Sequence, residues 1–119
     1  MQRDLRNYLW DIDKACEKIL LFTAGKTFSD YEKDSLIRAG VERMFMTIGE
    51  ALVQTAHHFP SQIADIPDYK SFIGFRNVLI HKYIDIVDEN VWKAVASSVK
   101  PLQASVSSLR VELDRAAND

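Results

Sequence analysis

The sequence is poor in residues that cross-link or interrupt a chain, with one cysteine, three prolines and four glycines among its 119 residues. A single cysteine, Cys16, excludes an internal disulfide framework and a zinc site built from cysteines. Because Cys16 lies on an apolar stripe at helical spacing, we interpret it as a small buried hydrophobic residue. Long stretches without glycine or proline favour helices over short strands joined by tight turns.

Long apolar runs and an excess of positive charge are also missing. No apolar stretch approaches the roughly 20 residues that a transmembrane helix needs, and Arg3, Asp4 and Arg6 near the start predict no signal peptide. Since an unpaired cysteine also suits a reducing compartment, we expect a cytoplasmic protein with no membrane partner. Lys and Arg number 15 against 17 Asp and Glu, a net charge of -2, so any RNA contact must come from a local patch.

Apolar residues recur at spacings of three and four along most of the chain, which is the pattern of amphipathic helices. The stripes predict a first helix from Leu5 that stops at Ala24-Gly25, a second from Asp30 to His58 with Ser29 or Asp30 as its cap, a third from Asp68 to Ile80, a fourth capped by Asp88, and a last one from about Pro101 to Ala117. Residues 59–67 and 81–87 are predicted to be a linker and a loop. We therefore expect residues 1–119 to form a single domain, an all-α, up-and-down bundle of four to five helices.

The second predicted helix has a broad apolar face, so we expect it to lie centrally and to touch more than one helix. Gly40 and Gly49 each weaken it by about 1 kcal/mol relative to alanine, and small residues inside a helix often mark the close approach of another helix. Glu50 lies on a predominantly apolar stretch and could pair with Arg76 or Arg43. We interpret Glu50 as a structural partner that holds an arginine, rather than as a catalytic group.

Other polar residues have simpler interpretations. His57 and His58 have no further ligands at metal-binding spacing, so we predict no metal site. Asp34 and Arg38, four residues apart, are interpreted as a solvent-facing ion pair on the second helix.

One stretch of the sequence gathers side chains that suit catalysis, namely Arg76-Asn77-Val78-Leu79-Ile80-His81-Lys82-Tyr83. Asn77 and His81 are four residues apart and would share one face of a continuing helix. Arg76 and His81 are five apart, which separates them by about 140° around a helix. The two converge best if the helix ends at His81, or if the site is assembled from two chains.

Arg76 and His81 are residue types that suit the cleavage of RNA. Histidine can take or give a proton near neutral pH, and arginine can fork two hydrogen bonds onto a phosphate. In RNA cleavage by the 2′-hydroxyl, a base removes the hydroxyl proton, a cation stabilises the phosphorane and an acid protonates the leaving oxygen. No metal is needed in that scheme. On spacing alone, a histidine that caps a helix end and an arginine in an ion pair explain the segment at least as well.

The neighbouring side chains fit the same chemistry. Asn77 could hold the histidine tautomer or a phosphate oxygen, and Tyr83 could position RNA by stacking or through its hydroxyl. Lys70 and Lys82 flank the segment and could supply the local positive patch that the chain as a whole lacks.

The same segment resembles the R-N-x-x-x-H-x-Y signature of HEPN-domain proteins, in their minimal HepT-like branch. Further stretches resemble the family in the same order along roughly residues 3–113: Arg3-Asp4, Phe28 to Asp34, Arg43 with Ile48-Gly49-Glu50-Ala51, Ile66-Pro67, and Val91-Trp92. Several spaced motifs in one order are much stronger evidence for the resemblance than the octapeptide alone.

The resemblance implies a metal-independent endoribonuclease without a cofactor, the toxin of a prokaryotic type VII-like toxin–antitoxin pair. It implies a homodimer in which the catalytic residues Arg76 and His81 of both chains line the RNA cleft, with Asn77 in support. It also implies a partner, an MntA-like minimal nucleotidyltransferase antitoxin, which silences the toxin by transferring AMP groups to Tyr83. Added AMP would block the cleft by its bulk and negative charge.

A second function remains open beside the ribonuclease. Related HEPN domains pair with nucleotidyltransferases, so a degenerate member could be a non-catalytic binding subunit that docks to such an enzyme. The intact Arg76, His81 and Tyr83 favour the ribonuclease, because a module freed from catalysis could lose them.

Overall fold

The computed structural model describes residues 3–118, except for the side chain of Tyr83. The helices, in chain order, are α1 (Leu5–Thr23), α2 (Phe28–Lys33), α3 (Ser35–His58), α4 (Pro60–Ile63), α5 (Tyr69–His81), the 3-10 helix η1 (Tyr83–Asp85), α6 (Asp88–Ser97) and α7 (Val99–Asn118). The described residues form no strand, so the predicted all-α class is confirmed, with the short α2 and α4 added to the five predicted helices. None of the described helices is both long and apolar enough to cross a membrane.

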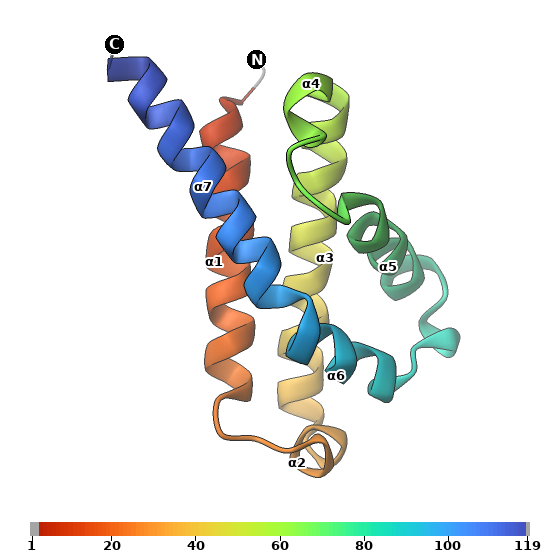
Figure 1. Cartoon of the computed structure of the whole chain (residues 1–119). Helices are drawn as coiled ribbons and strands as arrows, with labels where there is room; N and C mark the ends of the chain where they lie inside the picture. The colour runs from red at the N-terminus through yellow and green to blue at the C-terminus, as the bar shows by residue number, and fades with distance from the viewer. Residues whose placement is uncertain (1–2, 119) are drawn as a thin grey trace.

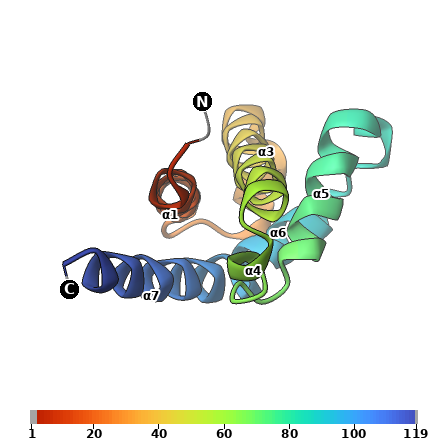
Figure 2. The ribbon, with the colours of Figure 1, turned by 90° about the horizontal axis from the view of Figure 1, so that it is seen from above.

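The bundle is organised around α3, as expected for the central helix. α3 packs against α1 on one side and against α5 on the other, while α7 runs obliquely across α1 (Figures 1 and 2). Viewed from above, α5 lies on the side of α3 away from α1, next to α6 (Figure 2). The segment that carries the Arg76–Tyr83 motif is therefore held to the rest of the bundle mainly through α3.

The core is built from the apolar stripes that define the helices. Its largest fully buried side chains are Tyr31, Phe45, Leu9, Ile12, Ile19, Ile48, Leu52, Ile66, Val41, Val91, Val99 and Val106. Burying a side chain such as leucine or phenylalanine contributes roughly 1.5–3 kcal/mol. The rings of Phe45 and Phe75 meet edge to face with centroids 5.1 Å apart, which fixes α5 against α3.

The prediction of one long second helix is wrong at its start, because the helix is interrupted at Asp34, which separates α2 from α3. The Oδ1 atom of Asp34 accepts hydrogen bonds from the backbone N–H groups of Leu36 and Ile37 at 3.0 and 3.1 Å. Asp34 therefore caps α3 and does not form the predicted ion pair with Arg38. The Nη1 atom of Arg38 donates instead to the backbone carbonyl oxygen of Glu32.

Two N-caps also differ from prediction. Thr27 caps α2 in place of Ser29 or Asp30, with Asp30 completing a capping box in which each side chain accepts a hydrogen bond from the other residue's backbone N–H. Val87, and not Asp88, is the N-cap of α6, where it makes no side-chain capping bond. Asp88 lies one position later, in the first turn, where its negative charge favours the helix N-terminus.

The two predicted connections contain short helices. α4 forms within residues 59–67, because Pro60 occupies its first position, where a missing N–H breaks no helical bond. The segment 81–87 contributes His81 to the last turn of α5 and then forms η1.

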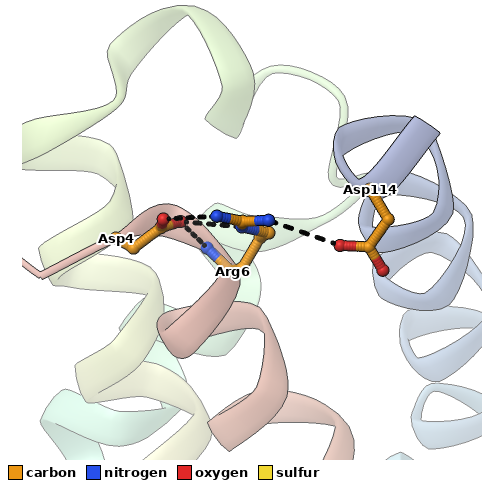
Figure 3. A network of polar contacts seen from close by, with 3 residues as sticks. All are labelled: Asp4, Arg6 and Asp114. Carbon is orange, nitrogen blue, oxygen red and sulfur yellow. Dashed lines mark hydrogen bonds and ion pairs between the residues drawn. The ribbon is translucent and has the colours of Figure 1, made fainter. Parts of the chain in front are cut away.

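The N-terminal end of α1 is joined to α7 by charged groups. The guanidinium of Arg6 lies 3.0 Å from the Asp4 carboxylate and 3.7 Å from that of Asp114 on α7 (Figure 3). Farther along the two helices, Arg110 pairs with Asp13 at 2.8 Å. These pairs fix the orientation of α7 on α1 but contribute little stability where they are exposed.

Candidate functional site

Gly49 of α3 lies against Arg76 of α5, at a point where the two helices approach closely. A Cβ atom added to Gly49 would overlap the Cβ of Arg76, lie 2.7 Å from its Cγ and lie 3.2 Å from the backbone oxygen of Phe72. Only glycine leaves room for this approach. The expectation that Gly49 marks a close helix contact is therefore confirmed, and the contact fixes the root of the Arg76 side chain.

The guanidinium of Arg76 is held by two side chains. Its Nη2 donates to Oε2 of Glu50 at 2.6 Å, and its Nη1 donates to Oδ1 of Asn77 at 2.8 Å. The other oxygen of Glu50 accepts from Nε2 of Gln54 at 3.1 Å. Of the two arginines that Glu50 was predicted to hold, Arg76 is thus the partner, in a hydrogen-bonded chain from Gln54 to Asn77.

Arg76 keeps hydrogen-bonding capacity beyond these contacts. A guanidinium has five N–H donors; two of them are used on Glu50 and Asn77, and the Nε atom is buried with no partner among the described residues. One donor on each terminal nitrogen is left. The side chain is 22% exposed, and two N–H donors on the terminal nitrogens of a guanidinium suit the two oxygens of a phosphate.

His81 is the last residue of α5 and is exposed to solvent. Within the described part of the chain, its ring forms no hydrogen bond or ion pair that would fix its tautomer. Because α5 is helical through His81, the five-residue interval places it about 140° around the helix from Arg76. The structure therefore brings Arg76, Glu50 and Asn77 together, and it shows no hydrogen bond from these residues to His81.

A family model described as Ribonuclease HepT-like matches residues 12–109. The chain belongs to the HepT-like ribonuclease family. This confirms the resemblance identified from the spaced motifs, and it makes ribonuclease the activity class of the family and RNA its class of substrate.

Relatives of this HepT-like protein include three archaeal chains. It is 31% identical over 110 residues to the probable ribonuclease HepT of Thermococcus cleftensis, with 92% of this chain and 99% of the relative covered. It is 30% identical over 105 residues to a candidate RNase of Methanocaldococcus jannaschii, with 88% and 95% covered. A second candidate RNase of that organism is 32% identical over 98 residues, with 82% and 80% covered. No solved structure matches the chain significantly.

The remaining predicted site residues of the HepT-like chain lie at opposite ends of α5. Lys82 follows His81 directly, whereas Lys70 lies at the start of α5, about 16 Å from His81 along the helix. Both lysines are exposed. Tyr83 begins η1, and its side chain lies outside the described part of the structure.

A groove beside the Arg76–Glu50 pair was missed by sequence reasoning. It has a volume of about 380 Å³ and lies between α1 and α3, with Ile80 of α5 at one side. Arg43, Thr47, Glu50 and Gln54 of α3 line it. These four polar residues recur at spacings of three and four, so they form a polar stripe along the helix. That stripe could have predicted the groove, but the helix was interpreted mainly from its apolar face.

Metal ligands are not gathered in this region. Within residues 3–118, no group of three or more His, Cys, Asp or Glu side chains is placed to hold a metal ion. The polar side chains described at the motif are Arg76, held by Glu50 and Asn77, and the exposed His81.

Proposed function

We propose that this HepT-like protein is a metal-independent endoribonuclease toxin, active in the cytoplasm as a homodimer, with Arg76 and His81 as its catalytic residues. The observation that carries the proposal is the hydrogen bonding of the Arg76 guanidinium. Its guanidinium is fixed by Glu50 and Asn77 and still has two N–H donors free for a phosphate. A positioned cation of this kind stabilises charge that develops in a transition state without further reorganisation.

The proposed reaction uses the RNA's own 2′-hydroxyl as the nucleophile. His81 of one chain takes the hydroxyl proton while the 2′-oxygen forms a bond to phosphorus. The two free donors of Arg76 stabilise the phosphorane oxygens. The bond from phosphorus to the 5′-oxygen then breaks, and the leaving oxygen takes a proton from water, after which His81 returns its proton to the solvent. The products are a 2′,3′-cyclic phosphate and a 5′-hydroxyl.

A dimer is supported by the position of the two catalytic residues and by the surface around them. Arg76 faces α3, and His81 lies about 140° farther around α5. The simplest way to bring an arginine and a histidine into one site is therefore for Arg76 of one chain to meet His81 of a second chain. Three apolar side chains near His81 are exposed: Ile80 by 42%, Ile84 by 84% and Val87 by 48%. A dimer interface would remove this apolar surface from water.

Cleavage of cellular RNA by the purified, unmodified protein in the presence of EDTA tests the proposal. His81→Ala and Arg76→Ala should each lower the cleavage rate by about a hundredfold or more, since each removes a group used in the transition state. His57→Ala is the matched control, because His57 is also an exposed histidine in the last turn of a helix, α3. It should leave the rate unchanged.

If the folded, unmodified wild-type dimer cleaves no RNA, the enzyme proposal is wrong, and a binding subunit that docks to a nucleotidyltransferase becomes the better interpretation.

The proposed partner is an MntA-like minimal nucleotidyltransferase antitoxin that modifies Tyr83. The phenol oxygen of Tyr83 attacks the α-phosphorus of ATP, pyrophosphate leaves, and an AMP group remains on the tyrosine. Incubation with the cognate nucleotidyltransferase and ATP should raise the mass of the chain by AMP units and abolish cleavage. Tyr83→Phe should show no gain in mass, whereas a gain that persists would place the modification on another residue.

A further inference from the structure

We propose that the groove between α1 and α3 binds the RNA backbone beside the cleavage site, with Arg43 as its phosphate-binding residue. This deepens the ribonuclease proposal and rests on it. It adds a binding path on α3 to the residues of the Arg76–Tyr83 motif.

The groove begins at the site and shares a wall with it. Glu50 lines the groove, and the same carboxylate holds Arg76 through Oε2 and Gln54 through Oε1. Gln54 also lines the groove, and so does Ile80, the residue before His81. An RNA strand with a phosphate at Arg76 would therefore have the groove immediately next to it.

The charges in the groove favour a phosphate at Arg43. Arg43 is exposed and forms no ion pair with any described residue. The second arginine of the groove, Arg3, is already engaged, because its Nη1 lies 2.8 Å from Asp11 and its guanidinium lies 4.9 Å from the centre of the Tyr8 ring. An arginine without a carboxylate partner keeps its bidentate donors for a phosphate.

Arg43 is too far along α3 to act on the same phosphate as Arg76. Arg43 precedes Glu50 by seven positions, which corresponds to about 10 Å of helix. Arg43 would therefore position the strand on one side of the scissile phosphate and would not stabilise the phosphorane. Its loss should weaken RNA binding and raise KM while leaving kcat nearly unchanged.

The test compares Arg43→Gln with the matched control Arg115→Gln, an exposed arginine of α7 with no ion pair among the described residues. Binding of a mixed-sequence, single-stranded RNA oligonucleotide is measured over a series of salt concentrations, with both variants made in a His81→Ala background that prevents cleavage. Arg43→Gln should bind about tenfold more weakly, as expected for the loss of a charged hydrogen bond. The slope of log K against log salt should become shallower by about 0.7, the value for one lost phosphate contact on a single strand.

The control variant should change neither the affinity nor the slope. In an otherwise wild-type background, Arg43→Gln should raise KM for the same oligonucleotide about tenfold and leave kcat within about twofold.

Failure of this inference is distinguishable from failure of the ribonuclease proposal. If the wild type cleaves RNA and Arg43→Gln keeps the wild-type affinity and salt slope, the groove assignment is wrong and the ribonuclease stands. If the wild type cleaves no RNA and Arg43→Gln still weakens RNA binding, the ribonuclease proposal is wrong and the groove assignment stands. If Arg43→Gln converts the dimer to a monomer in light scattering, the groove is an interface between two copies of this chain, and the RNA assignment is overturned.

Discussion

Gly49 allows the approach of α3 and α5 that sets the position of Arg76, and Gly49→Ala should therefore damage both stability and activity. The added Cβ would overlap the Cβ of Arg76 and meet the backbone of Phe72, so the helices must separate. Overpacking of this kind costs about 1–3 kcal/mol, which urea unfolding would measure. The cleavage rate should fall as well, because the guanidinium moves relative to Glu50.

Gly40→Ala is the control for this substitution. A Cβ on Gly40 would lie 3.2 Å from the ring of Phe22, a half-buried side chain that can move. The gain in helix propensity of about 1 kcal/mol should roughly offset that contact. Equal losses of stability in the two variants would show that the contact with Arg76 is not what makes Gly49 necessary.

Cys16 is expected to be inert in the folded protein. Its burial, and secondarily the charge of Asp13, raises the pKa of its thiol to about 12. A pH of 8 lies far below this pKa, so the thiol remains protonated, whereas the thiolate is the form that reacts. A disulfide reagent such as DTNB should label the native chain only at the rate of unfolding and should label it rapidly in denaturant. Fast labelling of the native protein would show that the α1–α3 core opens locally at Cys16.

At the level of helices, Asp34 separates α2 from α3, and its side chain stabilises the start of the longer helix. Asp34→Ala removes two hydrogen bonds to the backbone N–H groups of Leu36 and Ile37 and should lower the free energy of unfolding by about 1 kcal/mol. Asp34→Asn, which keeps an accepting oxygen, should lose only part of that. If both variants unfold like the wild type in urea, the capping bonds contribute nothing measurable.

The break at Asp34 shows why the sequence alone did not give the course of residues 28–58. No glycine or proline lies within residues 27–39 around the break, and aspartate is compatible with both an exposed helical position and an N-cap. The decisive contact is distant in sequence: Tyr31 of α2 is fully buried, and its ring lies 5.4 Å from that of Trp92 on α6. Periodicity describes the faces of a helix but does not reveal a partner sixty residues away.

Helices whose ends are marked locally were predicted to within a residue or two. α1 ends before Gly25, which adopts a φ of +70° that favours glycine. α5 follows Pro67 and ends at His81, one residue past the prediction. At the site, the ion pair of Glu50 was predictable because a lone carboxylate on an apolar stretch needs a cation. The groove beside it was not, because it depends on how α1 lies against α3.

For the whole molecule, the charges explain how an acidic chain can serve a family that acts on RNA. The net charge is -2, and most of the other arginines are neutralised by partners, as Arg3, Arg6 and Arg110 are by aspartates. Arg43 and the two free donors of Arg76 remain beside the groove on α3. RNA binding should therefore be local and should depend on a few contacts, in place of a broad basic surface.

The division of the site between two chains can be tested by complementation. If each site combines Arg76 of one chain with His81 of the other, a heterodimer of Arg76→Ala and His81→Ala has one site with both residues and one with neither. Two chains carrying different affinity tags are co-expressed, and the heterodimer is isolated through both tags. Its cleavage rate should be about half that of a doubly tagged wild-type dimer, because one of its two symmetric sites is intact.

The two parent homodimers are the controls for this experiment, and each should be nearly inactive because every one of their sites lacks one catalytic group. Activity in the heterodimer alone would require that the groups come from different chains. A heterodimer as inactive as its parents would instead place Arg76 and His81 of one chain in the same site. The C-terminal end of α5 would then have to rearrange on binding RNA, because the two side chains leave the helix about 140° apart.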